Sequence, residues 1–94
     1  MKKYELMYIL RADLDDETRG TVAEGLHKIL TDNGALIDEV IDWGLRDFAY
    51  LINDELRGYY TIVKFSSDAP ALNEFERLSK HNENVLRHMI VVEQ

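Results

Sequence analysis

The sequence predicts an α+β domain in which two helices cover one face of a four-stranded antiparallel sheet. Segments with strand-like and helix-like patterns follow one another in the order strand, helix, strand, strand, helix, strand. The chain has 94 residues, a length that suits one hydrophobic core. It contains no cysteine, which excludes a disulfide framework and a thiolate zinc site. A single domain over residues 1–94 is therefore expected.

The first strand and the first helix are predicted from two different periodicities. Residues 3–10 alternate imperfectly, and the larger apolar side chains share one face: Tyr4, Leu6, Tyr8 and Leu10. Residues 13–16 supply carboxylates that suit the start of a helix, and Gly34 suits the position just past its end. Between them the apolar side chains recur at helical spacing: Val22, Leu26, Ile29 and Leu30. A central strand followed by a helix is expected.

The middle of the chain is predicted to form a long hairpin. Residues 35–41 and 43–52 are rich in β-branched and aromatic side chains, and Gly44 indicates a bend or bulge in one long strand. Polar residues 53–57 are expected to form the hairpin loop, and residues 58–65 the returning strand. We expect Trp43 and Tyr50 to pack within this hairpin rather than to face a ligand.

The second helix begins with cap residues and a proline. Ser67 and Asp68 precede Pro70, which a helix tolerates in its first turn. The apolar stripe of this helix is expected to comprise Leu72, Phe75 and Leu78. A polar turn at residues 81–84 then leads into a last strand over residues 85–92.

This order of elements is that of the split β-α-β, or ferredoxin-like, arrangement. Right-handed crossovers place both helices on the same face of the sheet, so the other face stays open. We expect that open face to carry an apolar patch larger than a free monomer usually exposes, suited to a protein partner: Met7, Ile9, Tyr60, Ile62, Met89 and Val91.

Charge and the amino terminus limit the possible partners and compartments. The formal net charge is −7, so nucleic-acid binding would need a local basic patch or a basic partner. The amino terminus has no apolar run long enough for a signal peptide or a membrane span. A soluble, cytoplasmic protein that does not associate with membranes is expected.

The chemically reactive side chains do not form a recognisable catalytic pattern. His27, His81 and His88 lack the spacing of a metal site, and the carboxylates near Asp13 lack that of a calcium loop. Glycine-rich nucleotide-binding motifs are absent. The sequence therefore predicts no enzyme, no metal, no cofactor and no small-molecule substrate.

Residues 57–64 match the third-strand motif of RNA-recognition domains only in part. The fifth and eighth positions, which are aromatic in that motif, are Thr61 and Lys64. Base stacking through this motif is disfavoured.

Several runs, taken in order over nearly the whole chain, resemble the bacterial small-subunit ribosomal protein S6 family. They are Tyr4 to Arg11, Asn33-Gly34-Ala35, Trp43-Gly44-x-Arg46 with Ala49-Tyr50, Gly58-Tyr59-Tyr60, and Asn84 to Val91. The resemblance implies a structural protein of the small ribosomal subunit that binds the central domain of 16S rRNA together with the basic ribosomal protein S18. Such a partner would account for the acidic charge and the open apolar face.

The resemblance also indicates which residues contact RNA. Family members usually have two consecutive basic residues where this chain has Arg46 and Asp47. Arg46 is therefore the first candidate for a phosphate contact. The other candidates are Lys2, Lys3, Arg87 and His88, followed by Arg57 and Lys64.

Two other interpretations remain open. Asp47, Asp54 and Glu55 would also fit a protein-interaction module, or an engineered derivative of the same scaffold, in which RNA binding is weakened or lost. The third interpretation is a small ferredoxin-like enzyme or ligand-binding dimer with paired sheet faces, although the sequence shows no assembled site for it.

Overall fold

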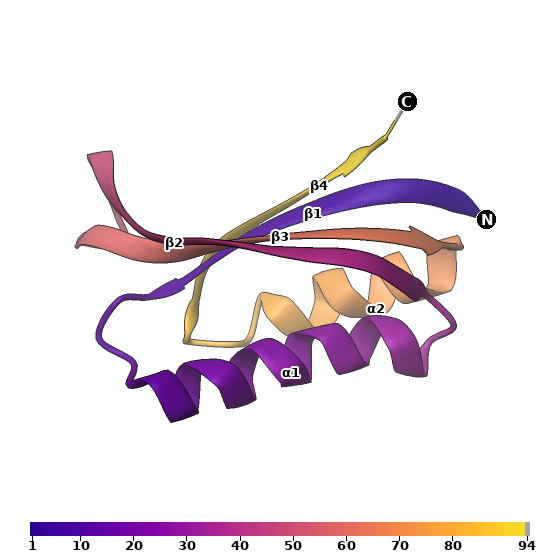
Figure 1. The fold of residues 1–94 in the computed structure, drawn as a ribbon, viewed down its shortest axis with the longest axis horizontal. Helices are drawn as coiled ribbons and strands as arrows, with labels where there is room; N and C mark the ends of the chain where they lie inside the picture. Colours follow the sequence, from indigo (N-terminus) through magenta and orange to yellow (C-terminus); the bar gives the residue numbers. More distant parts are fainter. Residues whose placement is uncertain (94) are drawn as a thin grey trace.

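The computed structural model describes residues 1–93 and has the predicted order of elements. They are β1 (Lys2–Arg11), α1 (Asp16–Asp32), β2 (Leu36–Ile52), β3 (Glu55–Ser67), α2 (Ala69–Ser79) and β4 (Val85–Val92). The strands form one antiparallel sheet in the order β2-β3-β1-β4, and both helices lie on the same side of it (Figure 1). The ferredoxin-like fold and the central position of β1 are confirmed.

Local sequence signals set the ends of α1. The side chain of Asp15 accepts a hydrogen bond from the backbone N–H of Thr18 at 2.7 Å, which satisfies one of the free donors of the first turn. At the other end Gly34 has φ of 93°, a left-handed conformation that glycine adopts without steric cost. The predicted start and end of this helix are therefore confirmed.

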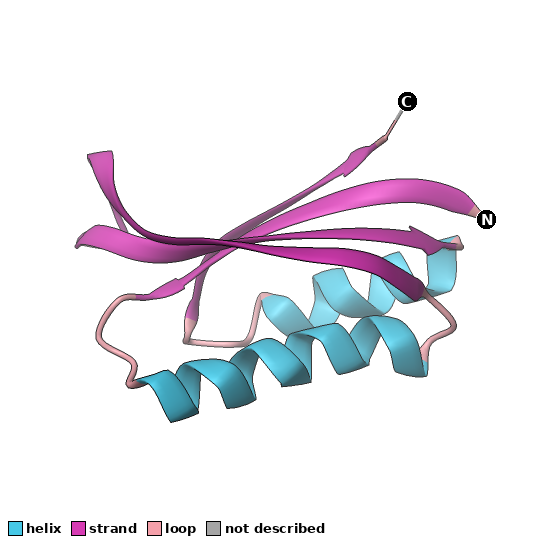
Figure 2. Ribbon diagram, in the orientation of Figure 1, coloured by secondary structure: helices cyan, strands magenta, loops and turns pink. Residues whose placement is uncertain are grey.

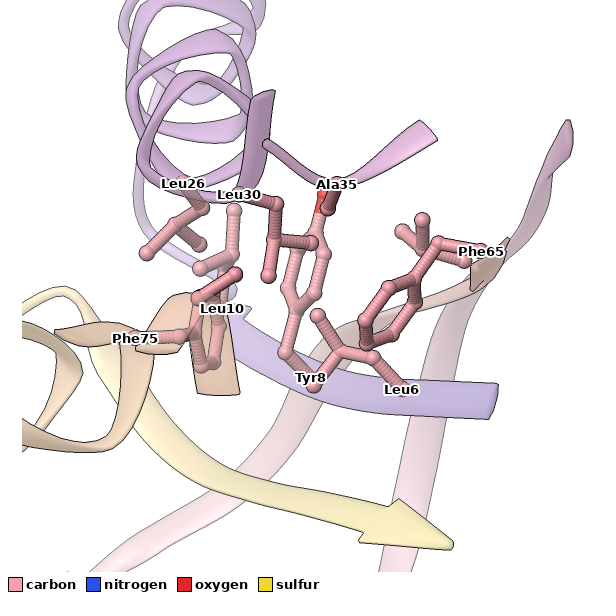
Figure 3. Packing of buried hydrophobic residues seen from close by; sticks show 10 residues of the cluster. Leu6, Tyr8, Leu10, Leu26, Leu30, Ala35, Phe65 and Phe75 are labelled. Atoms are coloured by element: carbon pink, nitrogen blue, oxygen red, sulfur yellow. The ribbon is translucent and has the colours of Figure 1, made fainter. Parts of the chain in front are cut away.

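The core lies between the helices and one face of the sheet (Figure 2). In β1, Leu6, Tyr8 and Leu10 point toward the helices, and their neighbours in β3 do the same. Figure 3 shows these side chains meeting Leu26 and Leu30 of α1 and Phe75 of α2. Full burial of each large apolar side chain contributes about 1.5–3 kcal/mol, so this face supplies most of the stability.

Two side-chain hydrogen bonds join buried polar groups of the sheet to groups at the margin of the core. The hydroxyl of Tyr8 and Nε2 of His27 are hydrogen-bonded at 2.9 Å, and Thr61 Oγ1 donates to Asp42 Oδ1 at 3.3 Å. Burial raises the pKa of Tyr8 to about 12, because the phenolate would lose its hydration. Burial also lowers the pKa of His27, so the neutral imidazole is favoured.

Two details differ from the prediction. The loop expected at residues 53–57 is a two-residue turn, Asn53–Asp54, with positive φ at both residues, and β3 already begins at Glu55. Asn and Asp tolerate this conformation, which matches the twist of the flanking strands. On α2 the buried residues are Ala71, Phe75 and Ser79, whereas Leu78 is exposed beside this stripe. The last strand, β4, lies at the sheet edge and is only partly buried.

Candidate RNA and protein interface on the open sheet face

The open face of the sheet is organised in cross-strand rows. At its middle, Met7 pairs with Ile62 on one side and Met89 on the other, and Ile62 pairs with Ile41. These four residues form an apolar row across all four strands. Because alternate residues of a strand point to opposite faces, the rows two residues away lie on the same face.

The rows on either side of this apolar row differ in charge. Toward one end Lys64 lies between Glu5 and Glu39 in the register. Toward the other end Ile9 lies between Tyr60 and Arg87. The next row pairs Gly58 with Arg46 on one side and with Arg11 on the other. The rows toward the hairpin arm therefore carry basic side chains, whereas in the row at the other end two carboxylates flank the one lysine.

The six residues predicted to bind a partner all lie on this face, but two of them are covered. Met89 is 51% exposed and Val91 is also exposed. By contrast, Ile9 is only 1% exposed and Ile62 is 7% exposed. The expectation that these two isoleucines meet a partner directly is therefore wrong, because neither side chain is exposed on this face.

Ile9 is covered by the hairpin arm, the part of β2 and β3 from residue 45 to residue 57. The ring of Phe48 lies 6.0 Å from the ring of Tyr60, centroid to centroid, above the position of Gly58. A Cβ atom on Gly58 would overlap Cγ2 of Ile9 and lie 2.8 Å from Cζ of Phe48. Glycine at position 58 therefore makes room for both side chains.

The tip of the hairpin arm is attached to the far edge of the sheet. The side-chain amide of Asn53 donates to the backbone carbonyl of Leu86 in β4 at 3.3 Å. Figure 1 shows this end of β2 and β3 curving away from the helices. The curvature follows two irregularities of the β2 register, one between Asp42 and Gly44 and one between Asp47 and Ile52. The bend predicted at Gly44 is confirmed.

The structure separates the predicted RNA contacts into groups. Arg46 and Arg87 lie on the open face at the end that carries the hairpin arm. Lys3 and Lys64 lie on the same face, at the other end. Six residues of β3 separate Gly58, beside Arg46, from Lys64, or about 20 Å at the usual rise per residue. One compact basic patch is therefore not formed.

The remaining candidates lie apart from this face. Arg57 forms an ion pair with Asp47, Nε to Oδ1 3.2 Å, and the alternation of the strand turns this pair away from Arg46. Nε2 of His88 lies 2.7 Å from Glu76 Oε2, and its ring packs edge-on against Phe75 of α2. Lys2 pairs with Ser67, a residue buried on the helix side.

The acidic charge of the chain is concentrated on the helix side. Residues 12–34 and 68–84, the helices with their loops, carry ten Asp or Glu and four Lys or Arg, a net charge of −6. The strands and the hairpin turn carry seven Asp or Glu and seven Lys or Arg, so their net charge is zero, and Glu93 after β4 accounts for the remaining −1. Because charges separated by more than about 10 Å are largely screened at physiological salt, the acidic helix layer does not cancel the basic side chains of the open face.

Sequence reasoning missed two exposed aromatic residues of β2. Tyr50 is 86% exposed and Trp43 is about half exposed, so the expectation that they pack within the hairpin is wrong. The guanidinium carbon of Arg46 lies 6.0 Å from the Trp43 ring centroid. In the motif-like segment Tyr59 and Thr61 face the helices, whereas Tyr60 between them faces the open side.

Residues 1–93 contain neither a cluster of metal-ligating side chains nor a membrane-spanning helix. No cluster of three or more His, Cys, Asp or Glu side chains in this part of the chain is arranged to hold a metal ion. Neither α1 nor α2, the helices of the same part, is long and apolar enough to cross a membrane.

The fold and this face define a small α+β binding domain with an open sheet surface. A family model described as Ribosomal protein S6 matches residues 3–92. The crystal structure of 30S ribosomal protein S6 from Thermotoga maritima is similar, with 29% sequence identity and a TM-score of 0.93. That match covers 98% of this chain and 87% of the Thermotoga chain. The chain belongs to the ribosomal protein S6 family, small-subunit ribosomal proteins whose role is structural rather than enzymatic.

Proposed function

We propose that this protein binds the central domain of 16S rRNA together with ribosomal protein S18, as a structural part of the cytoplasmic small ribosomal subunit. The observation that carries the proposal is the separation of charge between the two sides of the molecule. Nearly all of the net negative charge lies with the helices, whereas the open face combines an apolar row with basic side chains. The open face is therefore the surface that can approach phosphate.

The open face has separate parts for protein and for RNA. The exposed Met89 and Val91, with the partly buried Met7 beside them, form the apolar part, which suits a protein partner better than a phosphate backbone. Arg46 and Arg87 stand at the end with the hairpin arm, where their guanidinium groups can bind phosphate in a bidentate manner. Lys3 is a secondary contact at the opposite end.

The number of available basic side chains makes RNA binding dependent on the partner. Lys64 has carboxylates on both sides in the register, and Arg57 is paired with Asp47. Two or three phosphate contacts remain, which supply little affinity at physiological salt, since tight binders neutralise about six to ten phosphates. A basic partner such as S18 supplies the remainder.

Fluorescence anisotropy with a 16S central-domain fragment tests this proposal. Binding at physiological salt is expected with S18 present and is expected to be at least tenfold weaker without it. Arg46→Gln should reduce the slope of log affinity against log salt by about one, whereas Lys80→Gln on the helix side should leave it unchanged. Equally tight binding without S18 would contradict the partner dependence.

A protein-interaction module without RNA binding is the second candidate. The position of Lys64 between Glu5 and Glu39 favours it, because one of the predicted phosphate contacts is neutralised locally. In that case S18 would bind the open face, but adding this protein would not change the affinity of S18 for the rRNA fragment. The same titration therefore distinguishes the two candidates.

A further inference from the structure

A pocket lies between the hairpin arm and the open face of the sheet. It has a volume of about 260 Å³ and is lined by residues 47–52 of the arm, by Tyr60 of β3 and by Arg87 of β4. Tyr60 and Arg87 flank Ile9 of β1, so two strand spacings, about 10 Å, separate their backbones. The bond from Asn53 to Leu86 fixes the arm above this space.

We propose that this pocket accepts one unstacked nucleobase of the bound RNA. This inference rests on the proposed RNA binding and names the part of the RNA that this end of the open face takes. Proteins that read single-stranded or bulged RNA stack a splayed base on an aromatic ring and bind its edge with hydrogen bonds. The pocket contains groups suited to both interactions.

The aromatic surface comes from Tyr60 and Tyr50. Tyr60 packs against Phe48, which holds its ring in place, and Tyr50 is 86% exposed at the pocket wall. The 6.0 Å separation between the Phe48 and Tyr60 centroids is too short for a base between those two rings. A base therefore stacks on the pocket side of one tyrosine.

The hydrogen-bonding groups come from the backbone of the arm. Pairing between β2 and β3 passes from Asp47–Arg57 directly to Ile52–Glu55, so residues 48–51 lie opposite Leu56 alone. In such a bulge the extra residues have no partner in the ladder, which leaves N–H and C=O groups free to bind a base edge. An apolar protein side chain would leave these groups unsatisfied, so the lining favours a nucleobase.

The pocket is lined by two charged residues, Arg87 and Asp47, and the carboxylate of Asp47 is ion-paired with Arg57. Arg87 lines the pocket from the edge strand, and no ion pair of Arg87 is found within residues 1–93. Its guanidinium can bind the phosphate attached to the inserted base or stack on the base itself. Base and phosphate are therefore recognised by neighbouring groups.

Nuclear magnetic resonance on the full-length protein tests the pocket with three probes. These are single-stranded pentaribonucleotides, an abasic pentamer of equal charge, and the four nucleoside monophosphates. At least one base-containing pentamer should shift the ring signals of Phe48 and Tyr60, and the abasic pentamer should not. Equal shifts with the abasic pentamer would overturn the proposal, and equally tight binding of a monophosphate would overturn the assignment to RNA.

Variants inside and outside the pocket test whether the pentamer binds there. Tyr60→Leu and Arg87→Gln should each weaken binding of the pentamer at least about tenfold, the usual size of a lost base contact. Trp43→Leu and Lys80→Gln, which alter an aromatic and a basic residue outside the pocket, should leave it unchanged. Asn53→Gly keeps the positive φ of the turn while removing the bond to Leu86, and should also weaken binding. Equal losses in the control variants would overturn the proposal.

Assembly with S18 separates failure of the pocket from failure of the proposed function. If the wild type binds the rRNA fragment with S18 and Tyr60→Leu binds it equally well, the pocket proposal is wrong and the function stands. If the wild type does not bind the fragment with S18, the function itself is wrong. Displacement of the pentamer by S18 alone would show that the pocket is a protein contact.

Discussion

The two faces of the sheet use alternate residues of the same strands but have opposite roles. On the helix face, Leu6 and Tyr8 are completely buried, and their neighbours in β3 and the helices complete the core. On the open face, Met89 and Arg87 remain exposed at the edge. The difference shows that stability comes mainly from the helix face, so the open face can keep exposed side chains that suit a ligand.

The largest expected effect tests this difference in stability. Leu30→Ala removes a fully buried side chain and should lower the free energy of unfolding by about 2–5 kcal/mol. Met89→Ala, on the open face, should lower it by less than about 1 kcal/mol, because the side chain is half exposed. Urea denaturation of both variants measures the effects. Similar losses would mean that the open face also contributes to the core.

Gly58 is the position where the open face most resembles a core. Gly58→Ala places a Cβ between Ile9 and Phe48, and should cost about 1–3 kcal/mol and displace the hairpin arm. Gly25→Ala is the control, since open space surrounds its Cβ position in α1. That change should raise stability by about 0.5–1 kcal/mol. Urea denaturation measures the change in stability, and the nuclear magnetic resonance signals of the Phe48 ring report displacement of the hairpin arm. Unchanged Phe48 signals in Gly58→Ala would contradict the close packing of Ile9 and Phe48 around Gly58.

The partly buried His27, hydrogen-bonded to Tyr8 on the helix face, predicts that the free energy of unfolding depends on pH. Burial lowers the pKa of His27 despite Asp42 and Glu24 nearby, whereas the unfolded chain has the ordinary value of about 6.5. Below about pH 6.5 the unfolded state therefore binds more protons than the folded state. The stability that neutral His27 contributes is complete above about pH 6.5 and is lost as the pH falls through the lowered pKa of the folded state. His27→Gln should flatten the stability profile between pH 7 and 5. Parallel profiles from urea titrations would contradict this.

The smallest expected effect concerns Asp47. Its exposed ion pair with Arg57 should be worth less than about 0.5 kcal/mol, so Asp47→Asn should leave stability nearly unchanged. Because this pair points away from Arg46, Asp47→Arg should strengthen rRNA binding less than Arg46→Gln weakens it. Anisotropy titrations with S18 present compare the two variants, and the reverse order would show that Asp47 acts on the RNA side.

The elements and the identity of the open-face residues could be predicted because they depend on local periodicity. Alternation in β1 placed Tyr4, Leu6, Tyr8 and Leu10 on one face, and the caps of α1 marked its ends correctly. The hairpin arm was predicted less well. Its aromatics looked like core residues, and nothing local in the sequence indicates that the arm folds over Ile9 or reaches Leu86.

The same distinction applies to charge. Sequence gives the total of −7 and the neighbours of each residue along the chain, and adjacency made Asp47 look like the group that weakens Arg46. The fold turns these two side chains to opposite faces and pairs Asp47 with Arg57. It also collects most carboxylates on the helix side, away from Arg46 and Arg87.

The sequence by itself therefore determined the fold class, the family and which residues can share the open face. These follow from patterns of neighbouring residues, which are local and survive in any ferredoxin-like sheet. Only the tertiary structure decided that Ile9 is covered, that Arg46 and Arg87 lie at the same end of the open face, and that a pocket forms beside Tyr60. These features depend on register, on bulges and on the left-handed turn at Asn53–Asp54, which bring together residues far apart in the chain.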